Sequence, residues 1–173
     1  GTPLTPHRHG QPARTAVLLV NLGTPEAPTR AATRRYLAEF LADPRVVEIP
    51  RLAWLPLLHG VILRTRPRRS AARYAGIWMP EGSPLAVWTE RQARALQASM
   101  EQRGHGVLVA HAMRYGEPAL PRQLDQLVQG GATRVLVLPL YPQYSAATTA
   151  SAFAKVMQWA ATTRCRRRSA SWD

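Results

Sequence analysis

The sequence predicts an α/β domain built on an open parallel sheet of about four strands, with helices on both faces. Short, continuously apolar runs such as residues 15–23 are typical of strands buried on both faces. These runs alternate along the chain with helical patterns, an order that implies right-handed parallel crossovers. With 173 residues, 46% of them hydrophobic, the chain is long enough to bury one core.

The individual elements follow from the apolar runs and from signals that start and stop helices. Strands are expected at residues 15–23, 45–50, 106–113 and 133–140. Helices are expected after Thr29, over 51–66 as one or two broken pieces, over 70–78, from Pro84 to just before Gly104, and over 118–129 and 146–161. Thr29 and Ser83 are the expected N-caps, because their hydroxyls can accept a hydrogen bond from a free backbone N–H of the first turn.

Composition and charge limit the classes of function. The net charge is +13, and Lys155 is the only lysine, so the positive charge is almost entirely arginine. Such a chain suits an acidic ligand, an anionic membrane or nucleic acid, or else simply reflects arginine replacing lysine. No nucleic-acid motif is present, so no nucleic-acid partner is expected. The single cysteine, Cys165, excludes an internal disulfide, and no secretory signal or membrane span is evident. A cytoplasmic location is therefore expected.

Three loops are expected beyond the carboxyl ends of the strands, where open parallel sheets bind ligands. They offer Asn21, Leu22, Thr24, Met113, Arg114, Tyr115, Tyr141, Gln143, Tyr144 and Ser145. This mixture suits a large, flat, mostly apolar ligand with anionic edges, because tyrosines can cover a ring and Arg114 can pair with a carboxylate. The alternative is that Tyr141 and Tyr144 only pack helix ends. No histidine pair has metal-ligand spacing, and His111 is expected to be a core residue.

Four motifs in order resemble those of the ferrochelatase family, which inserts Fe²⁺ into protoporphyrin. They are "LLVNLGTPEAPT", "RYAGIW" followed by "GSPLAVWTERQ", "AMRYGEPAL" and "LPLYPQYSAATT", and together they cover residues 16–149. The resemblance implies a lyase of haem biosynthesis with two similar Rossmann-like (chelatase-like) lobes that hold the porphyrin between them. Its substrates are Fe²⁺ and a porphyrin, and no cofactor is required. Some members bind a [2Fe-2S] cluster through a cysteine where this chain has Ala146, so no cluster is expected.

The chain matches only the N-terminal lobe of such a protein. The expected organisation is a disordered segment at 1–14, the lobe at 15–163 and an arginine-rich tail at 164–173, at a truncation point. The family's metal-handling His and Glu lie beyond these residues, so no catalytic or metal residue is assigned and the chain is expected to be inactive alone. The porphyrin-binding residues that the resemblance implies are Leu22, Arg73, Tyr74, Ser83, Arg114, Tyr115, Tyr141, Tyr144 and Ser145.

Residues 50–69 match the family's lip over the porphyrin pocket. Apolar side chains flanked by arginines fit a contact with a membrane surface, for which the expected residues are Trp54, Leu55, Leu58 and Ile62. The alternative is that this apolar side seals the pocket or the core. An exposed face between lobes also predicts self-association. The rival functions are a porphyrin-binding module without catalysis, a chelatase for another tetrapyrrole and, remotely, a nucleic-acid-binding domain.

Overall fold

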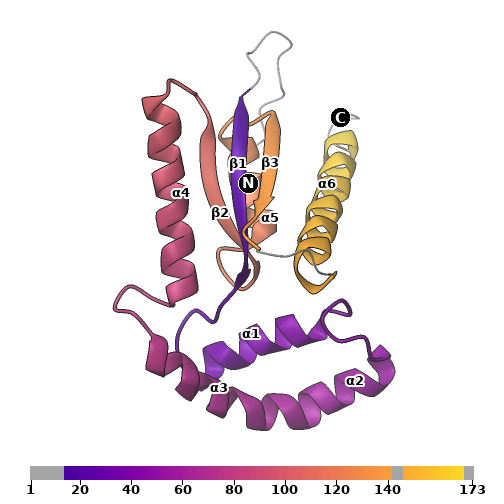
Figure 1. Ribbon diagram of the computed structural model, residues 1–173. Helices are drawn as coiled ribbons and strands as arrows, with labels where there is room; N and C mark the ends of the chain where they lie inside the picture. The colour runs from indigo at the N-terminus through magenta and orange to yellow at the C-terminus, as the bar shows by residue number, and fades with distance from the viewer. Residues whose placement is uncertain (1–13, 142–145, 170–173) are drawn as a thin grey trace.

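The centre of the molecule is a three-stranded parallel sheet. The computed structural model of the chain describes residues 14–141 and 146–169. Strands β1 (Thr15–Gly23), β2 (Leu108–Tyr115) and β3 (Arg134–Pro139) are arranged in the order β2-β1-β3, with both pairs parallel (Figure 1). The open parallel α/β architecture is thereby confirmed, with three strands in the described part of the chain rather than about four.

The strand expected at residues 45–50 is wrong. The backbone N–H groups of Val46 and Val47 donate to the carbonyl of Asp43 at 2.9 and 3.1 Å, which makes a turn. The Asp43 carboxylate also accepts from the backbone N–H of Arg45 at 2.9 Å. The two valines pack against the helix before them, so their apolar character reflects a local contact and not a place in the sheet.

Helices cover both faces of the sheet, as expected. Val17 and Leu19 of β1 face helix α4 (Pro84–Gln102), whereas Leu18 and Val20 pack in a separate core with α5 (Leu120–Gln129) and α6 (Ser151–Ser169). Successive strand residues point to opposite faces, which explains why the run is continuously apolar. The α4 cap is confirmed, because the Ser83 hydroxyl accepts from the N–H of Ala86 at 3.2 Å.

The remaining helices lie across the carboxyl ends of the strands (Figure 1). They are α1 (Arg30–Ala42), α2 (Arg51–Leu57), the π-helical turn η1 (Leu58–Ile62) and α3 (Leu63–Ile77). Thr29 caps α1 as expected, since its hydroxyl accepts from Ala32 at 3.3 Å. The expected separate helices at 51–66 and 70–78 are instead one continuous helical segment, because the π-helical turn carries the chain on beyond Pro56 without a break.

A second core joins these helices to the sheet. Tyr36 and Leu37 of α1, Leu58 of η1 and Leu63 of α3 pack with the fully buried Tyr115 at the end of β2. The Tyr36 hydroxyl donates to the carbonyl of Gly23 at 3.2 Å. None of the described helices combines the length and the hydrophobicity that crossing a bilayer requires.

The ends of β1 and β2 approach each other very closely at Gly23. The backbone of Gly23 has φ +121°, and a Cβ atom there would lie 1.9 Å from the carbonyl oxygen of Tyr115. Both the dihedral and the contact therefore require glycine at this position. On the α4 side of the sheet, Leu136 and Leu138 of β3 remain 58% and 44% exposed.

Candidate functional site

A buried hydrogen-bond network lies under the carboxyl end of β2. Arg114 donates from Nη2 to Asp43 Oδ2 at 2.6 Å and from Nε to the Ser151 hydroxyl at 2.7 Å. The hydroxyls of Tyr115 and Ser151 each donate to the same Asp43 oxygen at 2.8 Å. The side chains of Arg114 and Asp43 are only 10% and 5% exposed. The network therefore ties the end of α1, the end of β2 and the start of α6 together.

The network keeps Asp43 ionised and Tyr115 neutral. Burial by itself raises the pKa of Asp43, but hydrogen bonds from Arg45, Ser151 and Tyr115, together with the charge of Arg114, outweigh it and hold that pKa below its usual value. Burial raises the pKa of Tyr115 to about 12. The Arg114 guanidinium also lies over the Tyr115 ring, 4.4 Å from its centroid. A charged, fully hydrogen-bonded cluster of this kind is rigid as long as every member is present.

This placement changes the interpretation of two predicted site residues. Arg114 and Tyr115 were expected in a loop, yet β2 extends through both of them. Their polar groups are directed to Asp43 and Ser151, so in this structure they support the site from beneath. The sequence reasoning did not select Asp43 or Ser151, because a lone Asp before a proline and a serine within a helix carry no signal of a partner far along the chain.

Tyr141 follows β3 and lies at the same end of the sheet. Its ring is half-buried, and its buried hydroxyl has no hydrogen-bond partner among the residues that the structure describes. Burial raises the pKa of Tyr141 to about 12, against the opposing charge of Arg114. A buried hydroxyl without a partner costs free energy, so this atom is suited to a polar group of a ligand or to water. The predicted residues Tyr144 and Ser145 lie outside the described residues.

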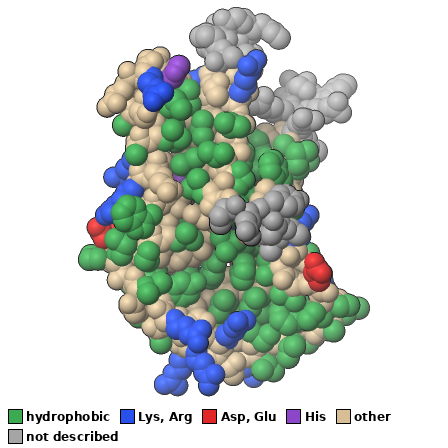
Figure 2. Space-filling view, viewed as in Figure 1, with side chains coloured by type: hydrophobic (Ala, Val, Ile, Leu, Met, Phe, Trp, Pro, Cys, Tyr) green, Lys and Arg blue, Asp and Glu red, His purple; other side chains and the backbone are tan. Residues whose placement is uncertain are grey.

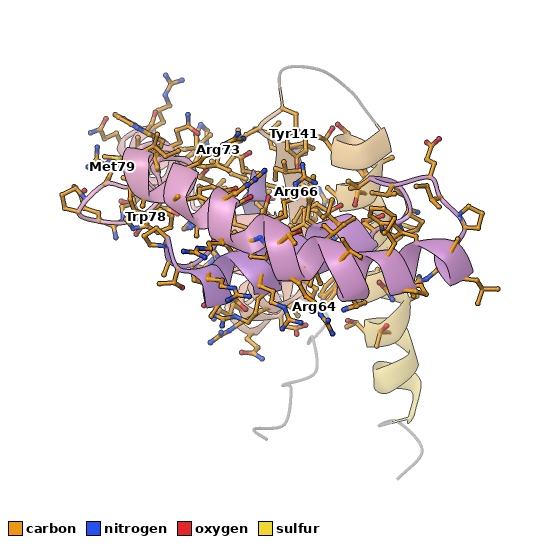
Figure 3. The ribbon with its side chains drawn as sticks, turned by 90° about the horizontal axis from the view of Figure 1, so that it is seen from below. Arg64, Arg66, Arg73, Trp78, Met79 and Tyr141 are labelled. Carbon is orange, nitrogen blue, oxygen red and sulfur yellow. The ribbon has the colours of Figure 1, made fainter. Side chains whose placement is uncertain are left out.

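One side of α3 presents arginines toward Tyr141. Figure 3 shows Arg66 and Arg73 on the side of α3 where Tyr141 lies, and Arg64 on the opposite side. In the orientation of Figure 1, Figure 2 shows basic side chains gathered at the bottom of the molecule, with hydrophobic side chains above them and to one side. Arg66 was not among the predicted site residues. The signal for it was the arginine run after residue 63, in which only the helical period tells which members share a side.

The other predicted residues occupy varied positions. Leu22 is half-buried at the end of β1, and Tyr74 is half-buried with its ring edge-on to Trp78, 6.4 Å between centroids. Burial raises the pKa of Tyr74. Ser83 is only 3% exposed and its oxygen caps α4, so its hydroxyl has a structural task already. Trp78, the partner of the Tyr74 ring, and Met79 lie at the C-terminal end of α3 (Figure 3).

The predicted lip residues point inward. Leu58 is wholly buried, and the Trp54 indole donates to the carbonyl of Leu41 at 2.7 Å. Leu55 and Ile62 are half-buried against α1. These four side chains therefore seal the core under α2 and η1, which was the alternative interpretation. The exposed apolar side chains of the segment are instead Leu52, Leu57 and Val61, at 94%, 46% and 53% exposure.

The site offers binding groups more clearly than it offers metal ligands. Within the described ranges, no three His, Cys, Asp or Glu side chains converge where they could hold a metal ion. His111 is half-buried in β2, and burial lowers its pKa. The groups available to a ligand at the carboxyl ends of the strands are thus apolar side chains, a tyrosine hydroxyl and the guanidinium groups of α3. These suit a large apolar ligand with acidic edges.

An open parallel α/β sheet, with helices across the carboxyl ends of its strands and such a site beside them, defines the class: one lobe of a chelatase fold. The ferrochelatase family model matches residues 14–172, and the chain belongs to the ferrochelatase family. It is 66% identical over 158 residues to a ferrochelatase of Methylibium petroleiphilum and 61% identical over 160 residues to one of Polaromonas. These matches cover 91% and 90% of the chain but only 44% of each relative, so the chain spans less than half the length of the curated relatives it matches.

Proposed function

We propose that this chain forms the porphyrin-binding wall of a ferrochelatase, which inserts Fe²⁺ into protoporphyrin IX or a related porphyrin. The observation that carries the proposal is the side of α3 on which Arg66 and Arg73 lie toward Tyr141, at the carboxyl ends of the strands (Figure 3). A porphyrin is a flat apolar ring with carboxylate side chains. Its ring fits the apolar part of this surface, and its propionates fit the guanidinium groups.

In this proposal the buried network beneath the site supports the binding wall. Insertion of a metal ion into a porphyrin requires the ring to bend and to lose its two pyrrole protons. A wall that fits the bent ring better than the flat one lowers the barrier by differential binding. Asp43, Arg114 and Tyr115 hold the end of β2 in place, and such a buried, mutually bonded cluster suits the rigid base that this requires.

Metal delivery and proton removal belong to groups outside these 173 residues in this proposal. The sequence contains no S-x-H-x-x-P segment, the family motif that carries the metal-handling histidine. The lobe alone therefore binds a porphyrin weakly and does not metallate it. A porphyrin-binding module with no catalytic role even in the longer protein is the second candidate, and the same experiments separate the two.

Porphyrin binding is tested by titrating the chain with protoporphyrin and following its fluorescence. We expect the double variant Arg66→Gln/Arg73→Gln to bind roughly tenfold more weakly, because two charge-assisted contacts to propionates are lost. The variant Arg103→Gln/Arg122→Gln removes the same charge from the C-cap of α4 and from α5, and it is the matched control. With porphyrin dimethyl ester, which has no carboxylates, the two variants should bind alike. A loss that persists with the ester would contradict a role for these arginines in holding propionates.

Activity is tested by anaerobic insertion of Fe²⁺, followed by the loss of free-porphyrin fluorescence. The chain alone should show none, and a chimera extended with the C-terminal portion of the Methylibium petroleiphilum ferrochelatase should metallate the ring. If the chimera folds and binds porphyrin but leaves it free of iron, the binding module becomes the better description.

A further inference from the structure

A basic groove lies between α1 and α3, on the side of α3 away from Tyr141. It has a volume of about 690 Å³ and is lined by Arg30, Ala31, Arg34, Arg35, Ala38, His59, Leu63 and Arg64. Arg64, which lines it, projects from the opposite side of α3 to Arg66 and Arg73 (Figure 3). The groove is therefore separate from the candidate porphyrin site, and nothing in the proposed function uses it.

The charges in this groove are poorly neutralised by the protein. Arg35 pairs with Glu26 at 3.1 Å, on the surface. Arg34 and Arg64 have no carboxylate within ion-pair distance among the residues that the structure describes, and no acidic residue lines the groove. Arg30 and Arg34 stand one helical turn apart, a spacing at which like charges repel each other. Holding four guanidiniums around one concavity costs free energy that a bound anion would recover.

The groove is also built in a way that suits a ligand with an apolar part. Ala31, Ala38 and Leu63 contribute its apolar lining, and the two alanines leave room that longer side chains would fill. Arg30 donates from Nη2 to the carbonyl of Arg64 at 3.4 Å, so it bridges the two helices. A volume near 690 Å³ exceeds what a single small ion needs and is in the range of pockets that hold organic ligands.

We propose that this groove binds a phosphate-bearing ligand through Arg34 and Arg64, with Arg30 completing the cation set. Guanidinium groups match phosphate oxygens in pairs, and several of them around one concavity favour a dianion or a phosphodiester over a single carboxylate. The phosphate can come from a soluble phosphorylated compound or from a lipid headgroup. The exposed Leu57 and Val61 do not line the groove, because residues two positions from His59 along a helical segment face away from it, so they favour neither source.

The experiment compares the chain with the double variant Arg34→Gln/Arg64→Gln. Inorganic pyrophosphate is the soluble probe, measured by isothermal titration calorimetry. Vesicles of phosphatidylcholine, with and without phosphatidylglycerol, are the lipid probe, measured by cosedimentation. We expect binding to at least one probe and about a tenfold or greater loss of it in the double variant. The control Arg103→Gln/Arg122→Gln carries the same change of net charge and should lose less than about twofold.

Each result of these binding experiments either supports or overturns the proposed phosphate site. Binding of pyrophosphate that depends on the groove assigns a soluble phosphate ligand, and binding only to the phosphatidylglycerol vesicles assigns a headgroup. Equal losses in the groove variant and the control would reduce the effect to net charge and overturn the proposal, as would binding to neither probe. Thermal unfolding shows whether both variants fold alike, and because Arg34 and Arg64 are exposed we expect no change there. Porphyrin binding by the groove variant should be unaltered.

Discussion

Near the carboxyl ends of the strands, the buried Arg114 and the exposed arginines of α3 have different roles. Arg114 is buried, bonded to Asp43 and Ser151, and stacked on Tyr115. The arginines of α3 are exposed, and those labelled in Figure 3 project from two different sides of the helix. The first kind fixes a framework, and the second kind is available to a ligand. The comparison teaches that a charged residue in a predicted binding loop can be structural, while the arginines of a basic run along a helix stay exposed and free to bind a ligand.

The largest effect should come from breaking the buried network. Asp43→Ala leaves the Arg114 guanidinium buried without its counter-charge, and we expect the free energy of unfolding to fall by about 3–5 kcal/mol. Urea denaturation measures it. Glu48→Ala removes an exposed carboxylate from the adjoining turn and should cost about 0.5 kcal/mol or less. Equal costs for the two would show that the network contributes no more than a surface charge does.

A smaller loss of stability is expected from truncating a buried side chain of the segment from α2 to η1, and almost none from truncating an exposed one. Leu58→Ala opens a cavity in the core under α1 and should cost about 2–4 kcal/mol. Its neighbour Leu57 is 46% exposed, so Leu57→Ala should cost about 0.5 kcal/mol or less. Thermal or urea unfolding of the two variants gives the difference. If Leu57→Ala proves as costly as Leu58→Ala, the inward and outward sides of the segment have been assigned wrongly.

The smallest effect is the pH dependence of the same network. The pKa of Asp43 is lowered by folding, so its contribution is fully present above its unfolded pKa of about 3.9 and is lost as pH falls through the lower folded value. The free energy of unfolding should therefore decrease below about pH 4. In Asp43→Asn this decrease should be shallower, because the amide does not titrate. Parallel pH profiles for the two proteins would assign the acid sensitivity to other carboxyl groups.

The sequence predicted the sheet and its helices well, because buried parallel strands and capped helices leave local signals. The run at 15–23, the caps at Thr29 and Ser83, and the alternation of elements were all sufficient. The turn at 45–50 was misjudged because Val46 and Val47 are as apolar as strand residues, and only the carbonyl of Asp43 decides their conformation. The pairing of Arg114 with Asp43 and Ser151 joins residues far apart in the chain, which no local pattern records.

The candidate site, like the fold, was predictable from the sequence only where the signal is local. The sequence predicted that the candidate residues gather at the carboxyl ends of the strands, and in the structure Leu22, Tyr115 and Tyr141 lie at that end of the sheet. It did not show which arginines of the basic run share a side, because that depends on the unbroken passage from η1 into α3. It also did not distinguish the inward Leu58 from the outward Leu57.

At Gly23, the carbonyl oxygen of Tyr115 occupies the space into which any side chain would have to grow. This glycine is the point at which β1 ends beside the residue that anchors the buried network. Each of the nineteen other amino acids carries at least a Cβ atom, and none can be accepted here without separating the two strands. Substitutions at this position should therefore not persist. Random variation of the chain can change exposed positions outside the binding surfaces, while this position stays fixed.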